Sequence, residues 1–155
     1  MSAARTAAGM LVYRRGPRGA LELLLAHPGG PFWAKKDLGA WSIFKGEPDP
    51  DEDLLACARR ELEEESGLAP AGPFLELGEI RQKGGKQVRA WAVEADADPE
   101  TLRSNEFIME WPPRSGRSAS FPEVDRYAWF DPAEARRRMN PAQAELIDRL
   151  AAQLT

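Results

Sequence analysis

The sequence is short of the side chains that most nucleophilic and thiolate chemistry uses. Its 155 residues include one cysteine, Cys57, and one histidine, His27. A single cysteine excludes an internal disulfide and a zinc site built from several cysteines. A catalytic triad would have to use His27, so acid–base chemistry elsewhere falls to carboxylates, lysine or tyrosine. We interpret His27 as a structural histidine and Cys57 as a small packing residue.

Long apolar runs are also missing. The longest, such as residues 23–26, fall far short of the ~20 residues of a membrane span, and residues 1–10 lack the extended apolar segment of a signal peptide. The net charge is −4 and the isoelectric point about 5.2, which predicts no general attraction to a nucleic-acid backbone or an anionic membrane. We therefore expect a cytoplasmic protein whose partner is a small molecule rather than a long nucleic acid or a membrane. We expect it to be a monomer or a homodimer.

The apolar segments that are present predict one α/β domain over residues 1–155. Residues 110–125 are expected to form a loop. Strands on both sides of one central helix, closed by C-terminal helices, indicate a mixed β-sheet between helices. The strands are expected at 7–13, 21–27, 41–44, 74–82, 87–95 and 126–130, and the helices at 51–66, 132–139 and 141–154.

The expected helix at 51–66 carries several glutamates on one side. At about 100° per residue, Glu61, Glu64 and Glu65 fall within one arc of about 100° beside an apolar stripe, whereas Glu63 points away. Like charges at this spacing repel by about 0.2–0.5 kcal/mol per pair, so helix propensity does not favour them. Two interpretations compete: a solvated charged face, or a set of carboxylate oxygens that binds a divalent cation.

The glutamates belong to a longer pattern. Its fixed positions are Gly46, Glu52, Arg60, Glu61, Leu62, Glu64, Glu65, Gly67 and Leu68. With five residues between the glycine and the first glutamate, and seven more before the arginine, the pattern resembles the Nudix box without a gap or mismatch. At average residue usage such a match is on the order of one in a billion per start position. This spacing favours the metal site over the solvated face.

The resemblance is to the Nudix hydrolase superfamily, whose members cleave a nucleoside diphosphate linked to another moiety with Mg²⁺ or Mn²⁺ bound. It implies a Nudix-type α/β/α sandwich with a mixed β-sheet between helices, and a Nudix pyrophosphohydrolase activity. Arg60 and Glu52 would brace the loop and helix, and Glu61 and Glu64 are the candidates for the general base. The implied metal ligands within the box are the backbone carbonyl of Gly46 and the side chains of Glu61, Glu64 and Glu65.

A further acid from outside the box often completes such sites. Our candidate is Glu123, because "FPEVDRYAWF" is similar to the family's segment in which an acidic residue precedes an aromatic strand. Glu106, Glu110 and Asp125 remain alternatives.

The substrate is predicted from "WSIFKG", residues 41–46. This stretch is similar to the approach to the box in dinucleoside-polyphosphate hydrolases, where Trp-x-x-Pro-Lys-Gly is usual, although Phe44 replaces the proline here. Dinucleoside polyphosphates are therefore the leading substrates. The alternatives are housecleaning hydrolysis of NTPs, hydrolysis of ADP-ribose or nucleotide sugars, action on RNA 5′ ends, and a nucleotide-sensing module with little turnover.

Four residues outside the box are candidate substrate contacts. Lys45 is a candidate phosphate contact, with a solvated surface lysine as the alternative. The ring of Trp33 is a candidate to stack on a nucleobase, although aromatic residues more often serve the core. Arg114 and Arg117 are candidates to clamp a terminal phosphate, although arginines in such loops are commonly just solvated.

Overall fold

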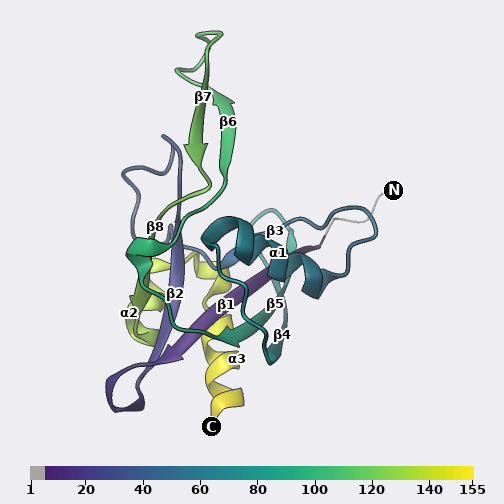
Figure 1. Cartoon of the computed structure of the whole chain (residues 1–155), viewed down its shortest axis with the longest axis vertical. Helices are drawn as coiled ribbons and strands as arrows, with labels where there is room; N and C mark the ends of the chain where they lie inside the picture. Colours follow the sequence, from purple (N-terminus) through teal and green to yellow (C-terminus); the bar gives the residue numbers. More distant parts are fainter. Residues whose placement is uncertain (1–5) are drawn as a thin grey trace.

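A six-stranded mixed sheet forms the centre of the fold (Figure 1). The structure, a computed structural model, describes residues 6–155. The strand order is β4-β5-β1-β2-β8, and β3 also pairs with β1. Strand β1 runs parallel to β5, whereas the other pairs in the sheet are antiparallel. The sheet strands are β1 (Ala7–Arg15), β2 (Leu21–Pro28), β3 (Phe44–Gly46), β4 (Phe74–Arg81), β5 (Gln87–Glu94) and β8 (Val124–Phe130).

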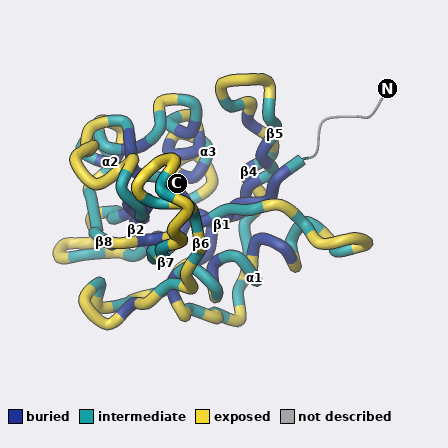
Figure 2. The backbone as a smooth tube through the Cα atoms, turned by 90° about the horizontal axis from the view of Figure 1, so that it is seen from above, coloured by how far each residue is buried: buried dark blue, intermediate teal, exposed yellow. Residues whose placement is uncertain are grey.

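Helices cover both faces of this sheet. Helix α1 (Leu54–Ser66) lies on one face, and α2 (Pro132–Arg138) and α3 (Glu145–Leu154) lie on the other (Figure 2). The central strand β1 supplies both cores, because successive side chains of a strand point to opposite faces. Met10 and Val12 pack in one cluster with Leu62 of α1, and Leu11 packs in the other with Leu146 of α3. The predicted α/β/α sandwich with a mixed sheet is therefore confirmed.

The box helix begins later than the sequence pattern predicts. Asp53 is its N-cap, and the Asp53 carboxylate accepts a hydrogen bond of 3.1 Å from the backbone N–H of Ala56. Asp51 cannot extend the helix because its φ is 63°. At the other end Gly67 adopts a left-handed conformation with a φ of 84°, which is the expected stop. The residues between β3 and the N-cap thus form a loop.

The prediction of a loop at 110–125 is wrong. Strands β6 (Glu106–Glu110) and β7 (Ser118–Pro122) pair as a separate two-stranded hairpin that projects from the body, as Figure 1 shows. Phe107 lies opposite Phe121, and Met109 lies opposite Ala119. Pro112, Pro113, Gly116 and both arginines lie in the turn between the strands, where a break in periodicity is normal, whereas Pro122 is the last residue of β7.

Smaller differences concern element ends. The short strand expected at 41–44 lies at Phe44–Gly46, whereas Trp41 and Ser42 make only isolated bridges. No helix among residues 6–155 is long and apolar enough to span a membrane.

Candidate active site

Strand β3, which ends at the first residue of the box, contacts helix α1, which carries the box glutamates. Gly46 closes β3, and a Cβ atom built there would overlap the carboxylate of Glu61. The backbone N–H of Lys45 donates a hydrogen bond of 3.3 Å to Oε1 of Glu65. The Cys57 thiol lies 3.6 Å from the carbonyl oxygen of Gly46, one turn of helix before Glu61. The structure therefore brings the carbonyl of the box glycine and the carboxylates of the box helix to one place.

Arg60 ties this helix to the loop that precedes it. Its Nε and Nη2 donate to the two carboxylate oxygens of Glu52, at 2.8 and 2.9 Å. These hydrogen bonds hold the pKa of Glu52 down, at about 2. The Nη1 group of the same guanidinium donates to Glu61 at 3.2 Å and to Glu64 at 3.1 Å. Arg60 thus orients the carboxylate of Glu52 in the preceding loop and the carboxylates of Glu61 and Glu64 in the helix.

Two of the box carboxyls share a hydrogen bond with each other. Burial, and then the charge of Glu61, raise the pKa of Glu65 to about 9. Burial, and then the charge of Glu64, raise the pKa of Glu61. The Glu65 carboxyl is therefore protonated at neutral pH, and its O–H donates a hydrogen bond to the carboxylate of Glu61. Such a shared proton marks a point where negative charge converges without a cation to balance it.

Glu123 is the acid outside the box that lies at this site. It lines a cavity together with Glu65, and burial, followed by the charge of Glu64, raises the pKa of Glu123. The three alternative acids are engaged elsewhere. Glu106 accepts from a serine across the hairpin, Glu110 accepts from two backbone N–H groups of the hairpin turn, and Asp125 pairs with the buried histidine ring.

The donor set fits a hard divalent cation. Among residues 6–155, no three His, Cys, Asp or Glu side chains are already gathered around a single point. Arg60 contacts Glu61, and Glu61 and Glu65 share a hydrogen bond. All the converging donors are nevertheless oxygens: one backbone carbonyl and several carboxylates, which are the ligands that Mg²⁺ takes. The guanidinium and the proton offset the same negative charge that a cation would offset.

A polar cavity of about 340 Å³ opens beside these carboxyls. Lys45 and Trp33, two of the expected substrate contacts, both line it. Trp33 is 40% exposed, and the Lys36 ammonium lies 5.0 Å from the centre of its ring. Burial lowers the pKa of Lys45, with the nearby charge of Lys86 as the next cause. This cavity therefore opens beside the box helix, with Glu65 in its lining.

The sequence pattern missed several polar residues that line this cavity, Gln143 among them. Gln143 is fully buried; its side-chain oxygen accepts from the backbone N–H of Ile43 at 3.0 Å, and its amide donates to the hydroxyl of Ser42 at 3.0 Å. Because these partners lie about 100 positions earlier in the chain, no local signal predicts the contact.

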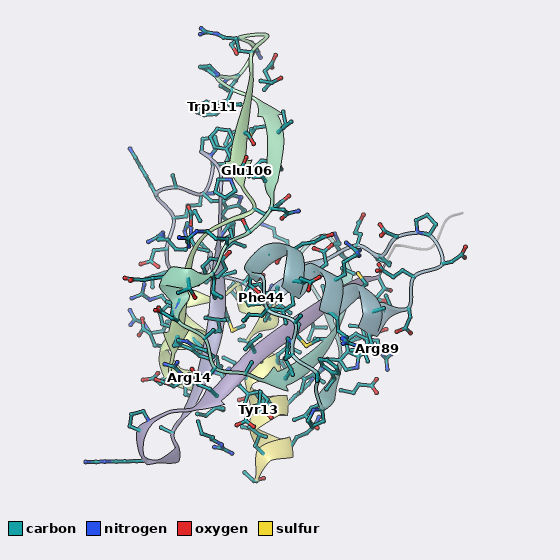
Figure 3. All side chains as sticks on the ribbon, viewed as in Figure 1. Tyr13, Arg14, Phe44, Arg89, Glu106 and Trp111 are labelled. Atoms are coloured by element: carbon teal, nitrogen blue, oxygen red, sulfur yellow. The ribbon has the colours of Figure 1, made fainter. Side chains whose placement is uncertain are left out.

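The other expected contacts lie elsewhere. Arg114 and Arg117 are in the turn at the outer end of the hairpin, away from α1, and Figure 3 labels Trp111 beside that turn.

The ring of His27 is buried, with Nδ1 2.7 Å from Asp125 and Nε2 2.6 Å from the carbonyl oxygen of Lys36. His27 therefore joins the long loop after β2 to strand β8.

The family follows from a direct comparison. A model described as the NUDIX domain matches residues 3–150. The chain belongs to this family. It is a Nudix pyrophosphohydrolase, an enzyme that hydrolyses nucleoside diphosphate derivatives. A comparison with curated protein sequences found no match.

Solved structures of Nudix proteins share the fold. An Ap4A hydrolase of C. elegans in a binary complex has 21% identity and a TM-score of 0.69, with 96% of this chain and 97% of that chain covered. The NUDIX domain of Shewanella oneidensis NrtR, complexed with ADP ribose, has 16% identity and a TM-score of 0.70, with 100% and 91% covered. A Nudix hydrolase from M. smegmatis, RenU, has 25% identity and a TM-score of 0.56, with 99% and 88% covered.

Proposed function

We propose that this Nudix enzyme cleaves the pyrophosphate linkage of dinucleoside polyphosphates, with Mg²⁺ or Mn²⁺ as the cation. The observation that carries the site is the close approach of the Gly46 backbone to the carboxylate of Glu61, which hydrogen-bonds to Glu65 in the lining of a polar cavity. The resemblance of residues 41–46 to dinucleoside-polyphosphate hydrolases supports the substrate class.

The cation would be held by the Gly46 carbonyl and, directly or through water, by Glu61, Glu64 and Glu65, with Glu123 as the acid from outside the box. When bound, a divalent ion polarises a water molecule and neutralises charge on the phosphate. Glu65 would have to release its proton to bind the ion, because ligating carboxyls must be deprotonated.

Glu64 is the general base in this proposal. Its side chain is 39% exposed, whereas that of Glu61 is 13% exposed, so water reaches Glu64 more readily. Arg60 contacts both oxygens of Glu64, at 3.2 and 3.1 Å, and fixes the orientation of the carboxylate. Lys45, which lines the same cavity, is placed to contact a phosphate.

The test is a hydrolysis panel of dinucleoside polyphosphates, NTPs, ADP-ribose and nucleotide sugars, each with Mg²⁺, with Mn²⁺ and with EDTA. We expect metal-dependent cleavage that is fastest for the dinucleoside polyphosphates. Glu64→Gln should lower kcat by about 10²- to 10⁴-fold. Glu63→Gln is the matched control, because the neighbouring carboxylate is exposed on another side of the helix and should be dispensable.

The outcomes separate the alternatives. Fastest cleavage of NTPs, ADP-ribose or a nucleotide sugar would replace the proposed substrate class. Cleavage that persists in EDTA, or in Glu64→Gln at the wild-type rate, would refute the proposed site. Absence of cleavage across the panel would point to a sensing module instead.

A further inference from the structure

A second cavity, of about 380 Å³, lies between the loop that follows β2 and the β6–β7 hairpin. Gly30, Phe32 and Trp33 line it from the loop, and Phe107 and Met109 line it from the hairpin. Its lining is therefore apolar and aromatic. A single ionisable residue, Glu123, completes it.

Close backbone contacts fix the walls of this apolar cavity. The N–H of Gly29 donates a hydrogen bond of 2.9 Å to the carbonyl of Glu123, and a Cβ atom at Gly29 would overlap the carbonyl oxygen of Pro122. Gly30 has a φ of 94°, and a Cβ atom there would lie 2.9 Å from the ring of Phe107. Only glycines permit the loop to approach the hairpin this closely.

The outer part of the hairpin is held to the same loop. The rings of Phe32 and Trp111 meet edge to face, with centroids 5.6 Å apart. Phe107 and Phe121 lie 6.0 Å apart across the hairpin. An isolated two-stranded hairpin is marginally stable in water, so these contacts give the wall its position.

The apolar cavity adjoins the polar cavity beside the box. Pro28, Trp33 and Glu123 line both. A ligand that extends through this junction therefore passes Glu123, and its two ends lie in surroundings of different polarity: Lys45, Gln143 and Glu65 on one side, and aromatic rings on the other.

We propose that the apolar cavity binds the second nucleobase of a dinucleoside polyphosphate, with Phe107 as its specificity-determining contact. Phosphate is disfavoured there because the only charged lining group is a carboxylate. An uncharged planar ring fits, because aromatic side chains stack on every base. The inference rests on the proposed substrate class, since only a substrate with a ring at each end uses both cavities.

The test compares two ligands that share one adenosine tetraphosphate moiety and differ in whether a second nucleoside is attached to its terminal phosphate: diadenosine tetraphosphate and adenosine 5′-tetraphosphate. Their dissociation constants are measured by calorimetry with Mg²⁺ in a Glu64→Gln background, so that the measurement does not depend on turnover. We expect the dinucleotide to bind about 5- to 150-fold more tightly, the range that base stacking gives.

Variants then assign this preference to the cavity. Phe107→Ala should bring the affinity ratio close to one and leave the affinity for adenosine tetraphosphate unchanged. Phe107→Leu, which removes the ring and keeps an apolar side chain, should also lower the ratio and guards against loss of the hairpin. Ile108→Ala is the matched control, because Ile108 is the next residue of β6, is 74% exposed and does not line the cavity.

Each outcome bears on the inference. Equal affinity for the two ligands in the parent protein, failure of either to bind, or a preference that survives both Phe107 variants would overturn it. A preference lost equally in Ile108→Ala would also overturn it, because the effect would then come from the hairpin as a whole. The proposed function fails separately, by the absence of metal-dependent hydrolysis in the wild-type enzyme.

Discussion

The backbone of Gly46 lies directly against the carboxylate of Glu61. A Cβ atom at position 46 would overlap the carboxyl group of Glu61, which is the end of a flexible side chain and can move away. We therefore expect Gly46→Ala to fold with nearly unchanged stability but to displace this carboxylate. Metal affinity and kcat/KM should each fall by about 10- to 100-fold, as when a group that orients a metal ligand is lost.

The Gly46→Ala effect should depend on Glu61. In a Glu61→Gln background the glycine substitution should add little, because both changes act on one group. The measurement is a double-mutant cycle on kcat/KM and on Mg²⁺ affinity, with thermal unfolding as the check on folding. Additive losses would show that the two positions act independently.

Proton release from Glu65 should make metal binding depend on pH. Because the pKa of Glu65 is raised to about 9, a cation must displace its proton at any lower pH. The apparent affinity for Mg²⁺ should rise with pH up to about 9, by about tenfold per unit if one proton is released. Calorimetric titration in buffers of different ionisation enthalpy counts the protons. A Glu65→Gln variant should bind more weakly and lose the slope.

The same shift sets the pH dependence of stability without metal. The folded protein holds this proton to a higher pH than the unfolded chain does, so its contribution is complete below about 4.3 and is lost as the pH rises towards 9. Thermal unfolding in EDTA should therefore show a decline across this window that Glu65→Gln lacks. Mg²⁺ should offset the decline most at high pH.

The box could be predicted from the sequence because its chemistry is local. Spacing along one helix fixes which carboxylates share a face, and the cap residue Asp53 and the left-handed Gly67 delimit that helix within a few residues of the expected ends. The central strands β1 and β2 were predictable for a similar reason, because burial on both faces makes each of them a nearly continuous apolar run.

The second cavity could not be predicted, because its walls come together only in the folded chain. Phe107 is about 75 residues from the loop that it faces. The strand that carries it precedes a turn rich in proline and arginine, and the sequence pattern did not identify that strand. Gln143 gives the same lesson, since its partners lie in the segment before the box. Sequence periodicity reports which side of an element is apolar, but not which distant element it meets.

Cys57 should be inert despite its position within the box. Burial, and then the charge of Glu52, raise the pKa of its thiol to about 12, so almost no thiolate forms at neutral pH. We expect a disulfide reagent to label the native protein at least ~100-fold more slowly than the urea-unfolded protein, which has one reactive thiol. Cys57→Ala should retain most activity. Rapid labelling that abolishes hydrolysis would contradict the packing role.

The Arg60–Glu52 pair should appear in the acid limb of the stability curve. The pKa of Glu52 is held at about 2, mainly by hydrogen bonds from Arg60, so its contribution is present above about 4.3 and is lost as the pH falls towards 2. The difference in unfolding free energy between wild type and Glu52→Gln should be largest near neutral pH and should shrink across this window. Asp49→Asn is the control, because Asp49 lies 3.6 Å from the same guanidinium and is mostly exposed. A constant difference from pH 7 to 2 would show that Glu52 acts through packing rather than charge.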